Sequence, residues 1–267
     1  QGLFAAHHIE NARGAIMPDT IAPQLLAFAK TSRAYLDGAS RRKMIRFVRS
    51  CWNADGGVRG RDDRSDLYYT VFGALCLKTL GGRIPILRLW RYLQSFGDGA
   101  ELDPVHMYSL IRLRTMFPIS STRRNQLTRR LQDYPAESPY DIFFKVISAE
   151  QLNKEDRPKA LLLLSSSQTT PNLAAAIVVN QNKNEEAKAL LMERFCPESG
   201  GFSVSSTSRN ADLLSTATAL FALTVLKADM EPIREKTFEF IESLWREDGG
   251  FCAYAQDGFV DVEYTFY

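Results

Sequence analysis

Three arginines in the segment GGVRGRDDR have the type and spacing to bind an anion. Arg59, Arg61 and Arg64 lie within six residues, and the planar guanidinium presents donors that match the oxygens of phosphate or diphosphate. Asp66 follows at once and opens an apolar segment, whose N-terminus as a helix would also favour negative charge. The segment therefore predicts an anion site. The alternative is that the arginines pair with Asp62, Asp63 and the repeated aspartates.

The element that must position this loop is a repeated unit. Nearly the same phrase occurs three times, as SCWNADGGVRGRDDRSDLYYTVFGALCLKTL from residue 50, RFCPESGGFSVSSTSRNADLLSTATALFALTVL from 194 and SLWREDGGFCAYAQDGFVDVEYTFY from 243. In each phrase a Gly-Gly pair is followed, nine to eleven residues later, by an aspartate that opens an apolar segment, and it is preceded by an aromatic residue: Trp52, Phe195 or Trp245. Self-similarity of this kind indicates one supersecondary unit stacked several times.

Weaker copies fill the space between the strong ones. Apolar segments begin at Asp66, Asp212 and Asp261, and further ones at Asp103 and Asp141, with Asn172 standing in for the aspartate in PNLAAAIVVNQ. Aspartate and asparagine are favoured N-caps, so we expect these residues to start helices that are buried on most sides. Glycine tolerates positive φ, so we expect each Gly-Gly pair to turn the chain into such a helix.

Amphipathic segments alternate with the apolar ones. They carry charge on one face at helical spacing and predict outer helices over 41–52, 84–96, 121–133, 155–165, 184–195 and 230–245. Alternating charged and apolar helices predict an all-α double layer, an inner ring of helices enclosed by an outer ring. We expect a single domain over 1–267, with units starting near 19, 41, 84, 121, 155, 184 and 230 and the last unit truncated.

The phrases around the three Gly-Gly pairs resemble the repeats of the prenyltransferase and squalene-cyclase superfamily, in particular the β-subunit of protein prenyltransferases. The resemblance implies an α/α toroid of about six helical hairpins around a central cavity that binds an isoprenoid. It also implies a prenyltransferase-like or terpene-cyclase-like transferase, with a possible helical partner subunit. The terpene cyclases of the superfamily use a DxDD motif, which this chain lacks, since RDDRSD at 61–66 has the wrong spacing.

The protein prenyltransferases hold zinc with an Asp-x-Cys at the start of one inner helix and a histidine three residues after the aspartate of the next. On this pattern His106 follows Asp103 correctly and the preceding unit supplies Asp66, but Tyr68 stands where the cysteine belongs, and the last unit has Asp261-x-Glu263. The resemblance thus implies Asp66, His106 and Tyr68 at the reacting centre and a possible zinc ion on Asp66 and His106. The alternative is that the aspartates are helix caps and His106 is a polar lining residue.

The resemblance also assigns the substrate site. Arg59, Arg61 and Arg64 would hold the diphosphate, and the apolar chain would lie against aromatic side chains at Tyr68, Tyr69, Tyr108, Phe143, Phe144 and Tyr264. Aromatic residues at these positions would equally serve as core between inner helices.

Composition excludes several other classes. A net charge of +2, with the basic clusters inside helix-like segments, argues against nucleic-acid binding, and four cysteines without a CxxC pair argue against a disulfide or cysteine-rich zinc module. No apolar run is long enough to span a bilayer and the first residues lack the layout of a signal peptide, so we expect a cytoplasmic protein. His7 and His8 are predicted to be incidental, and no phosphate loop, dinucleotide fingerprint or nucleophile elbow is present.

Two other functions stay open. The toroid could be catalytically silent and bind a lipid or a partner protein, as the missing cysteine ligand and missing DxDD favour. It could also be a carbohydrate-active α/α barrel, which needs paired carboxylates across the cavity; the capping role already explains the regular placement of Asp66, Asp141, Asp212 and Asp261.

Overall fold

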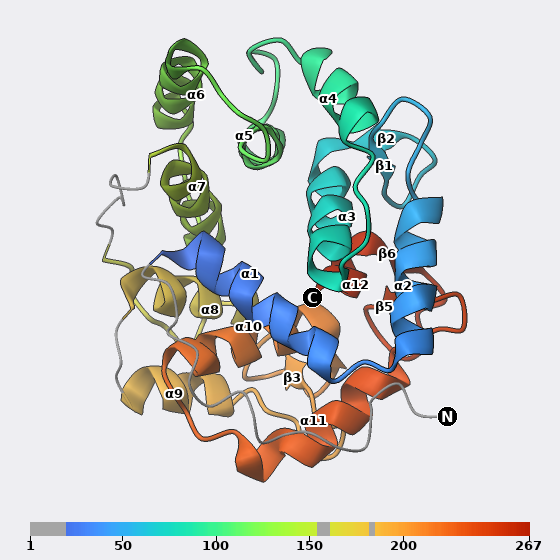
Figure 1. The fold of residues 1–267 in the computed structure, drawn as a ribbon. Helices are drawn as coiled ribbons and strands as arrows, with labels where there is room; N and C mark the ends of the chain where they lie inside the picture. Colours follow the sequence, from blue (N-terminus) through green and yellow to red (C-terminus); the bar gives the residue numbers. More distant parts are fainter. Residues whose placement is uncertain (1–19, 154–160, 182–184) are drawn as a thin grey trace.

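The predicted double ring of helices is present. The computed structural model describes residues 20–153, 161–181 and 185–267. Its inner helices are α3 (Leu67–Leu80), α5 (Pro104–Arg114), α7 (Pro139–Leu152), α8 (Thr170–Asn180), α10 (Leu213–Val225) and the short α12 (Val262–Phe266). Outside them lie α2 (Gly38–Ser50), α4 (Ile86–Gln94), α6 (Ser121–Asp133), α9 (Glu185–Met192) and α11 (Glu231–Ser243) (Figure 1).

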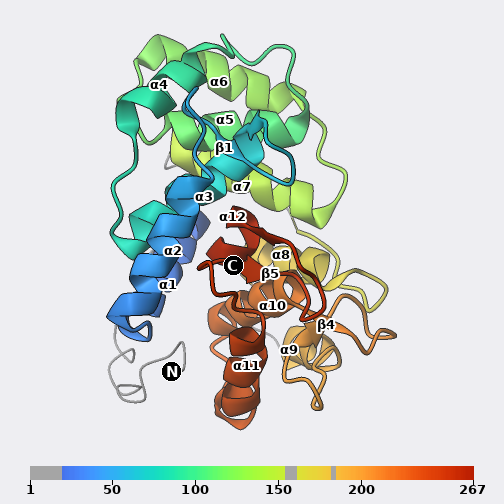
Figure 2. The same ribbon diagram turned by 90° about the vertical axis from the view of Figure 1, so that its right-hand side faces the viewer.

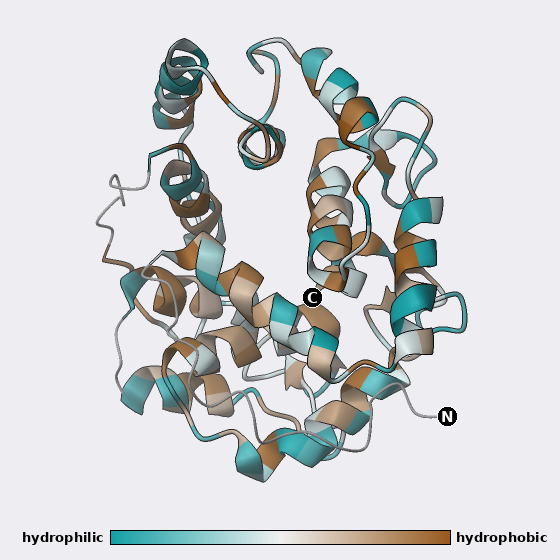
Figure 3. Cartoon of the chain, in the orientation of Figure 1, coloured by the Kyte–Doolittle hydropathy of each residue, from teal (hydrophilic) through white to brown (hydrophobic). Residues whose placement is uncertain are grey.

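The inner helices pack in chain order around the ring. α3 packs on α5, α5 on α7, α7 on α8 and α8 on α10, while α12 packs on α3. The helix α1 (Ile21–Thr31), which continues into a short 3-10 helix (Ser32–Ala34), contacts both α3 and α7. Apolar residues gather on the inner helices and polar residues on most outer ones (Figure 3). Within the described residues, no helix combines the length and the hydropathy needed to cross a bilayer.

Four of the six expected helix caps are confirmed. The side chains of Asp66, Asp103, Asp212 and Asp261 each accept a hydrogen bond from the backbone N–H three residues on, at 2.8 to 3.1 Å. The prediction was wrong for α7 and α8. Ser138 caps α7, with Asp141 completing a capping box three residues later, and Thr169 precedes α8. Asn172 instead accepts a hydrogen bond from the backbone N–H of Tyr140 in the neighbouring helix.

Each Gly-Gly pair turns the chain against the outer helix of another unit. Gly56 has φ +101° and Gly249 has φ +101°, values that side-chain-bearing residues rarely adopt. A Cβ on Gly56 would lie 2.2 Å from the backbone oxygen of Arg88 in α4, and a Cβ on Gly249 would lie 2.5 Å from the backbone of Lys43 in α2. The glycines are therefore required by backbone conformation and by close packing together.

A repeated threonine joins each turn to the inner helix that follows. Thr70, Thr216 and Thr265 each lie four residues after a capping aspartate, and their hydroxyls donate to the backbone oxygen of that aspartate. The same hydroxyls accept a hydrogen bond from the backbone N–H that follows the Gly-Gly pair, at 2.9 to 3.2 Å. The sequence did not lead us to expect the short antiparallel strand pairs that form here: β1–β2 (Val58–Arg59, Ser65–Asp66), β3–β4 (Phe202–Ser203, Ala211–Asp212) and β5–β6 (Phe251–Cys252, Val260–Asp261).

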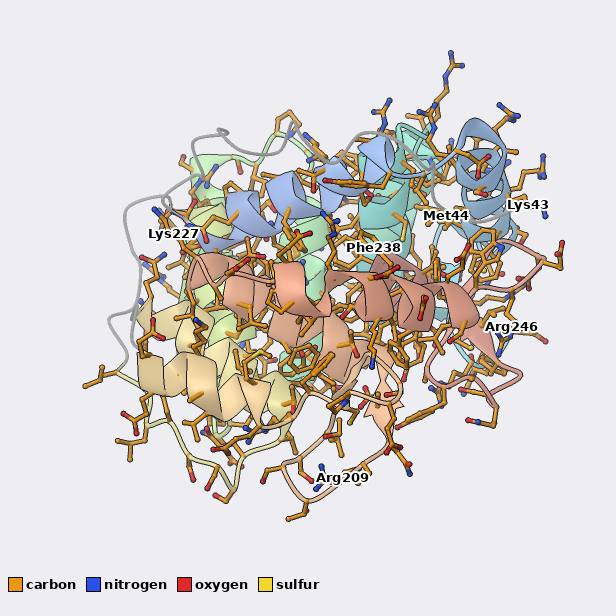
Figure 4. The ribbon with its side chains drawn as sticks, turned by 90° about the horizontal axis from the view of Figure 1, so that it is seen from below. Lys43, Met44, Arg209, Lys227, Phe238 and Arg246 are labelled. Carbon is orange, nitrogen blue, oxygen red and sulfur yellow. The ribbon has the colours of Figure 1, made fainter. Side chains whose placement is uncertain are left out.

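The last unit packs on the first. Beyond the contact of α12 with α3, Met44 of α2 lies in one core cluster with Leu244 and Phe251 of the last unit. Lys43 forms an exposed ion pair with Glu247 at 3.0 Å, and the view from below places Lys43 and Met44 of α2 near Arg246, which follows α11 (Figure 4). The ring is thus joined between its first and last units.

One expected outer helix is not found where the chain is described. Residues 161–165 of the predicted helix 155–165 are not helical, and 155–160 lie outside the described residues. His7, His8 and the predicted unit starts near 19, 155 and 184 also lie outside the described residues. The other outer helices are observed with ends shifted by a few residues, as is common for helix boundaries.

Candidate functional site

His106 bridges the start of two inner helices. Its Nε2 lies 2.8 Å from Oδ2 of Asp66, the cap of α3, and its Nδ1 lies 2.6 Å from Oδ2 of Asp103, the cap of its own helix. Burial opposes a charged imidazole, but the hydrogen bonds that the ring donates to both carboxylates, and the charges of those carboxylates, outweigh burial and raise the pKa of His106. The structure therefore brings together Asp66 and His106, with Asp103 as a third member.

These side chains do not fit a zinc site as they are arranged. Both ring nitrogens of His106 face carboxylate oxygens at hydrogen-bond distance, so a metal at either nitrogen would have to displace a carboxylate from its present position. In the part of the chain that the structure describes, no group of three or more His, Cys, Asp or Glu side chains is arranged so that it could hold a metal ion. The four cysteines, Cys51, Cys76, Cys196 and Cys252, are all buried. Zinc at Asp66 and His106 stays a prediction, and no step below depends on it.

Tyr68 donates a hydrogen bond to a carboxylate that faces it from α12. The distance from its hydroxyl to Oε1 of Glu263 is 2.5 Å. Removal from water raises the pKa of Glu263 to about 7, against the smaller opposing effect of the bond from Tyr68. Burial likewise raises the pKa of Tyr68, so the phenol stays protonated. Burial thus brings the pKa of Glu263 close to neutral pH.

Aromatic rings from three inner helices surround this pair. The interior aromatic cluster consists of residues in successive ring contact, joined across the ring by a 2.8 Å hydrogen bond between the hydroxyls of Tyr140 and Tyr267: Tyr68, Phe72, Tyr140, Phe143, Phe144, Phe266 and Tyr267. Arg112 of α5 lies over the ring of Phe144 at 5.7 Å. Its Nε has no hydrogen-bond partner among the described residues, and burial lowers its pKa.

The arginine-rich loop borders a pocket of about 520 Å³. We call it the arginine pocket; its lining residues come from α2, from the loop between β1 and β2 and from the last unit: Arg46, Phe47, Ser50, Cys51, Arg59, Gly60, Arg61, Asp62, Asp63, Asp248, Phe259, Val260 and Asp261. Arg61 lies 3.8 Å from Asp261 and over the rings of Phe259 and Tyr264, at 5.9 and 6.0 Å. Arg46 of the outer helix α2 also lines this pocket, a position that was not predicted from the sequence.

The structure separates the three arginines that the sequence grouped. Arg59 and Arg61 line the arginine pocket, whereas Arg64 is not among its lining residues and instead forms an exposed ion pair with Asp62 at 2.9 Å. The alternative, in which the arginines pair with nearby or repeated aspartates, is thus confirmed for Arg64 with Asp62 and for Arg61 with Asp261.

Tyr69 and Tyr264 lie between the arginine pocket and the interior. A Cβ on Gly60 would come within 2.2 Å of the Tyr69 ring, and that ring meets Tyr68 edge-on at 5.5 Å. The hydroxyl of Tyr264 is 3.4 Å from a guanidinium nitrogen of Arg61. Tyr108 lies elsewhere, buried in the core shared by α3 to α7. Phe143 and Phe144 belong to the interior aromatic cluster.

Sequence reasoning missed four polar residues of these sites. Glu263 was noted only as the wrong residue for zinc, although a carboxylate inside a buried helix is itself a signal. Arg112 carried the same signal, as a charge in the apolar phrase PVHMYSLIRLR. Arg46 and Tyr140 gave no such signal, because their positions depend on how separate units meet.

Comparison with protein families identifies the class to which this fold belongs. The family model described as the prenyltransferase alpha-alpha toroid domain matches residues 6–107 and 121–267, nearly the whole chain. The chain therefore belongs to this family, within the prenyltransferase and squalene-cyclase superfamily, and the all-α toroid prediction is confirmed. A search of curated proteins finds no match. At the level of the family, the match supports a function related to isoprenoids.

Proposed function

We propose that this protein binds an isoprenoid diphosphate, with the diphosphate in the arginine pocket and the apolar chain against the interior aromatic cluster. The observation that carries the proposal is the continuity of the two sites. Tyr69 touches Gly60 of the pocket on one side and Tyr68 of the cluster on the other. A ligand with an anionic diphosphate head and a long apolar tail matches this arrangement. Its head would lie in the arginine pocket and its tail against the interior aromatic cluster.

The charges of the arginine pocket leave room for an anion. Four carboxylates also line the pocket. Asp62 pairs with Arg64 and Asp261 with Arg61, while Asp63 and Asp248 form no ion pair among the described residues. Arg46 and Arg59 have no carboxylate within ion-pair distance among the described residues. Guanidinium groups in this state are available to phosphate oxygens.

The chemistry that we propose at the interior is proton transfer by Glu263, held by Tyr68. Near pH 7, a carboxyl group with a pKa of about 7 is protonated in a large fraction of the molecules, and it can donate that proton without a large energetic cost. The aromatic faces around the pair would stabilise positive charge on a bound hydrocarbon. A catalytically silent toroid is the second candidate, favoured by the arrangement of His106, whose two ring nitrogens are both engaged with carboxylates.

Ligand-dependent melting tests the binding proposal. Farnesyl diphosphate and geranylgeranyl diphosphate at about 100 times the Kd should stabilise the protein by about 2.7 kcal/mol and raise Tm by several degrees. Pyrophosphate and farnesol, which each match one part of the site, should give smaller shifts. Arg59→Ala and Arg61→Ala should each weaken binding by about tenfold, since each removes a charged hydrogen-bond donor.

Arg64→Ala is the matched control, because it removes an arginine of the same loop that does not line the pocket. An unchanged Tm with every isoprenoid diphosphate would contradict the proposal, as would an equal loss of affinity in the Arg64→Ala variant. Mass spectrometry of the recovered ligand separates the two candidate functions: an enzyme returns a changed isoprenoid, and that change should be lost in Glu263→Gln, whereas a silent toroid returns the ligand intact.

A further inference from the structure

The outer helix α4 presents large apolar side chains to solvent. Ile86, Leu87 and Trp90 are 46%, 74% and 49% exposed. The outward faces of α2 and α6 are polar instead, and their apolar residues are turned into the protein. α4 is thus an exception among these outer helices.

Packing of α4 on the ring does not require these exposed residues. Leu89, Tyr92 and Leu93 form its buried face and lie in the core cluster shared with α3 and α5. Ile86, Leu87 and Trp90 lie on the other side of the helix. Exposed large apolar groups of this kind mark an interaction surface.

The charge on α4 itself has one sign, and Asp55 is the carboxylate of the turn that packs against α4 at Arg88. Arg83, Arg88 and Arg91 are exposed next to the apolar residues, and α4 contains no carboxylate. The neighbouring α6 adds four arginines and has a single aspartate at its last position. Three carboxylates lie between the two helices in the chain: Asp98 is paired with Arg130 at 3.0 Å, Asp103 faces His106, and Glu101 is exposed. We define the α4 surface as Ile86, Leu87 and Trp90 together with Arg83, Arg88 and Arg91.

The α4 surface lies at one edge of the molecule. α4 and α6 run along the same edge, with α5 beneath them (Figure 2). A hollow of about 240 Å³ continues the apolar surface from Trp90 to Phe117 and Ile119, with Arg123 beside it. An extended partner can therefore reach the whole surface at once.

We propose that the α4 surface binds an anionic phospholipid bilayer in a peripheral, non-spanning mode. A short helix with exposed Leu and Trp and a belt of arginines has the composition of an interfacial membrane anchor. The apolar tips would enter the boundary between headgroups and acyl chains, where the amphipathic indole of Trp90 is favoured, and the guanidinium groups would meet lipid phosphates. The argument uses residues outside the arginine pocket and does not depend on the proposed isoprenoid site.

Sedimentation with lipid vesicles tests the proposal. The whole protein should sediment with vesicles of phosphatidylserine and phosphatidylcholine in a 3:7 mixture and stay in solution with phosphatidylcholine alone, and added salt should release it. The double variant Leu87→Gln/Trp90→Gln should lose binding. Arg88→Gln and Arg91→Gln should each lower the partition coefficient by about fivefold, the loss expected for one arginine near such a surface.

The matched control is Val204→Gln/Tyr254→Gln, which removes apolar side chains that are 42% and 46% exposed on loops of other units. It should bind vesicles like the unchanged protein. Trp90 also supplies a direct signal, because its fluorescence should shift to shorter wavelength on binding, and circular dichroism of each variant confirms that the fold is retained. The proposal is overturned if the protein ignores anionic vesicles, if Leu87→Gln/Trp90→Gln binds them as well as the control, or if the surface binds soluble polyglutamate but no vesicle, which would indicate an acidic protein partner.

Discussion

At the scale of single residues, the carboxyl group of Glu263 is unusual because it is largely buried and accepts a hydrogen bond from Tyr68. It lies near the end of the chain, in a helix of five residues, and its hydrogen bond from Tyr68 joins the last unit to the first. Burial raises its pKa to about 7. A group that is held protonated by the fold makes stability depend on pH.

The sign of that dependence follows from the direction of the shift. Between about pH 4.5, the ordinary value for glutamate, and about pH 7, the folded protein keeps a proton that the unfolded chain has released. The free energy of unfolding should therefore fall as pH rises through this window, by about 3 kcal/mol in total from this group. Glu263→Gln, which keeps the shape and an acceptor for Tyr68, should remove that part of the slope.

Urea unfolding at pH 4.5, 5.5, 6.5 and 7.5 measures how the free energy of unfolding changes with pH. Asp212 and Asp261, whose pKa values burial also raises, contribute their own slope in both proteins, so the difference between variants is the relevant quantity. Glu247→Gln, which changes an exposed glutamate, is the control and should leave the slope unchanged. Equal slopes in wild type and Glu263→Gln would show that Glu263 has an ordinary pKa.

At the scale of elements, the Gly-Gly turns fix where neighbouring units touch. The turn at Gly249 packs against the backbone of α2, and its φ of +101° excludes a side chain on conformational grounds as well. Gly258, only nine residues later, has open space around its Cβ position and an ordinary φ. The two positions therefore form a matched pair for substitution.

Gly249→Ala and Gly258→Ala should have opposite effects. The backbone conformation alone should cost Gly249→Ala about 1–3 kcal/mol of unfolding free energy, and the clash with Lys43 adds to this. Gly258→Ala should be neutral or stabilising by up to about 1 kcal/mol, since it restricts only the unfolded chain. Chemical denaturation measures both; similar losses in the two variants would mean that close packing at the turn contributes little.

The sequence alone predicted most of the features that lie within one repeat unit. The aspartates at 66, 103, 212 and 261 cap helices as expected, because a cap depends on the few residues that follow it. Asp141 was assigned wrongly because Ser138, three residues earlier, forms an equally good cap and makes Asp141 its partner. Local competition of this kind is not resolved by spacing alone.

The site was less predictable because it forms between units. Arg59 and Arg61 were found from their loop, but Arg46 and Phe259 join them only because α2 and the last unit meet there. The pairing of Tyr68 with Glu263 spans 195 residues of sequence. Contacts at that separation depend on ring closure, which the repeat pattern left undetermined.

At the scale of the whole molecule, closure makes the first and last units one packing unit. Val262 of α12 is fully buried in a cluster with Phe47 and Val48 of α2 and Phe72 of α3. In a linear array of repeats each unit would contact only its neighbours in sequence, and the ends could open separately. A closed ring should instead lose its two ends together.

Val262→Ala tests this coupling. It should cost about 2 kcal/mol through lost burial and the cavity left behind, and native-state hydrogen exchange should show faster exchange in α2 and α3 as well as in the last unit. Val204→Ala, at a half-exposed loop position, is the control and should change neither. Faster exchange confined to residues 244–267 would contradict the coupling.

The hydrogen bonds of the repeated threonines Thr70, Thr216 and Thr265 bear on which changes of loop length the protein tolerates. In each strong unit Thr70, Thr216 or Thr265 ties the backbone after the Gly-Gly pair to the capping aspartate, so both ends of the intervening loop are anchored independently of its length. The loop from Gly57 to Asp66 is two residues shorter than those from Gly201 to Asp212 and from Gly250 to Asp261. Insertions and deletions there should be tolerated at little cost in stability. Arg59 and Arg61, the arginines of the proposed diphosphate site, lie in this segment, so such length changes would alter the arginine pocket while the ring itself is left undisturbed.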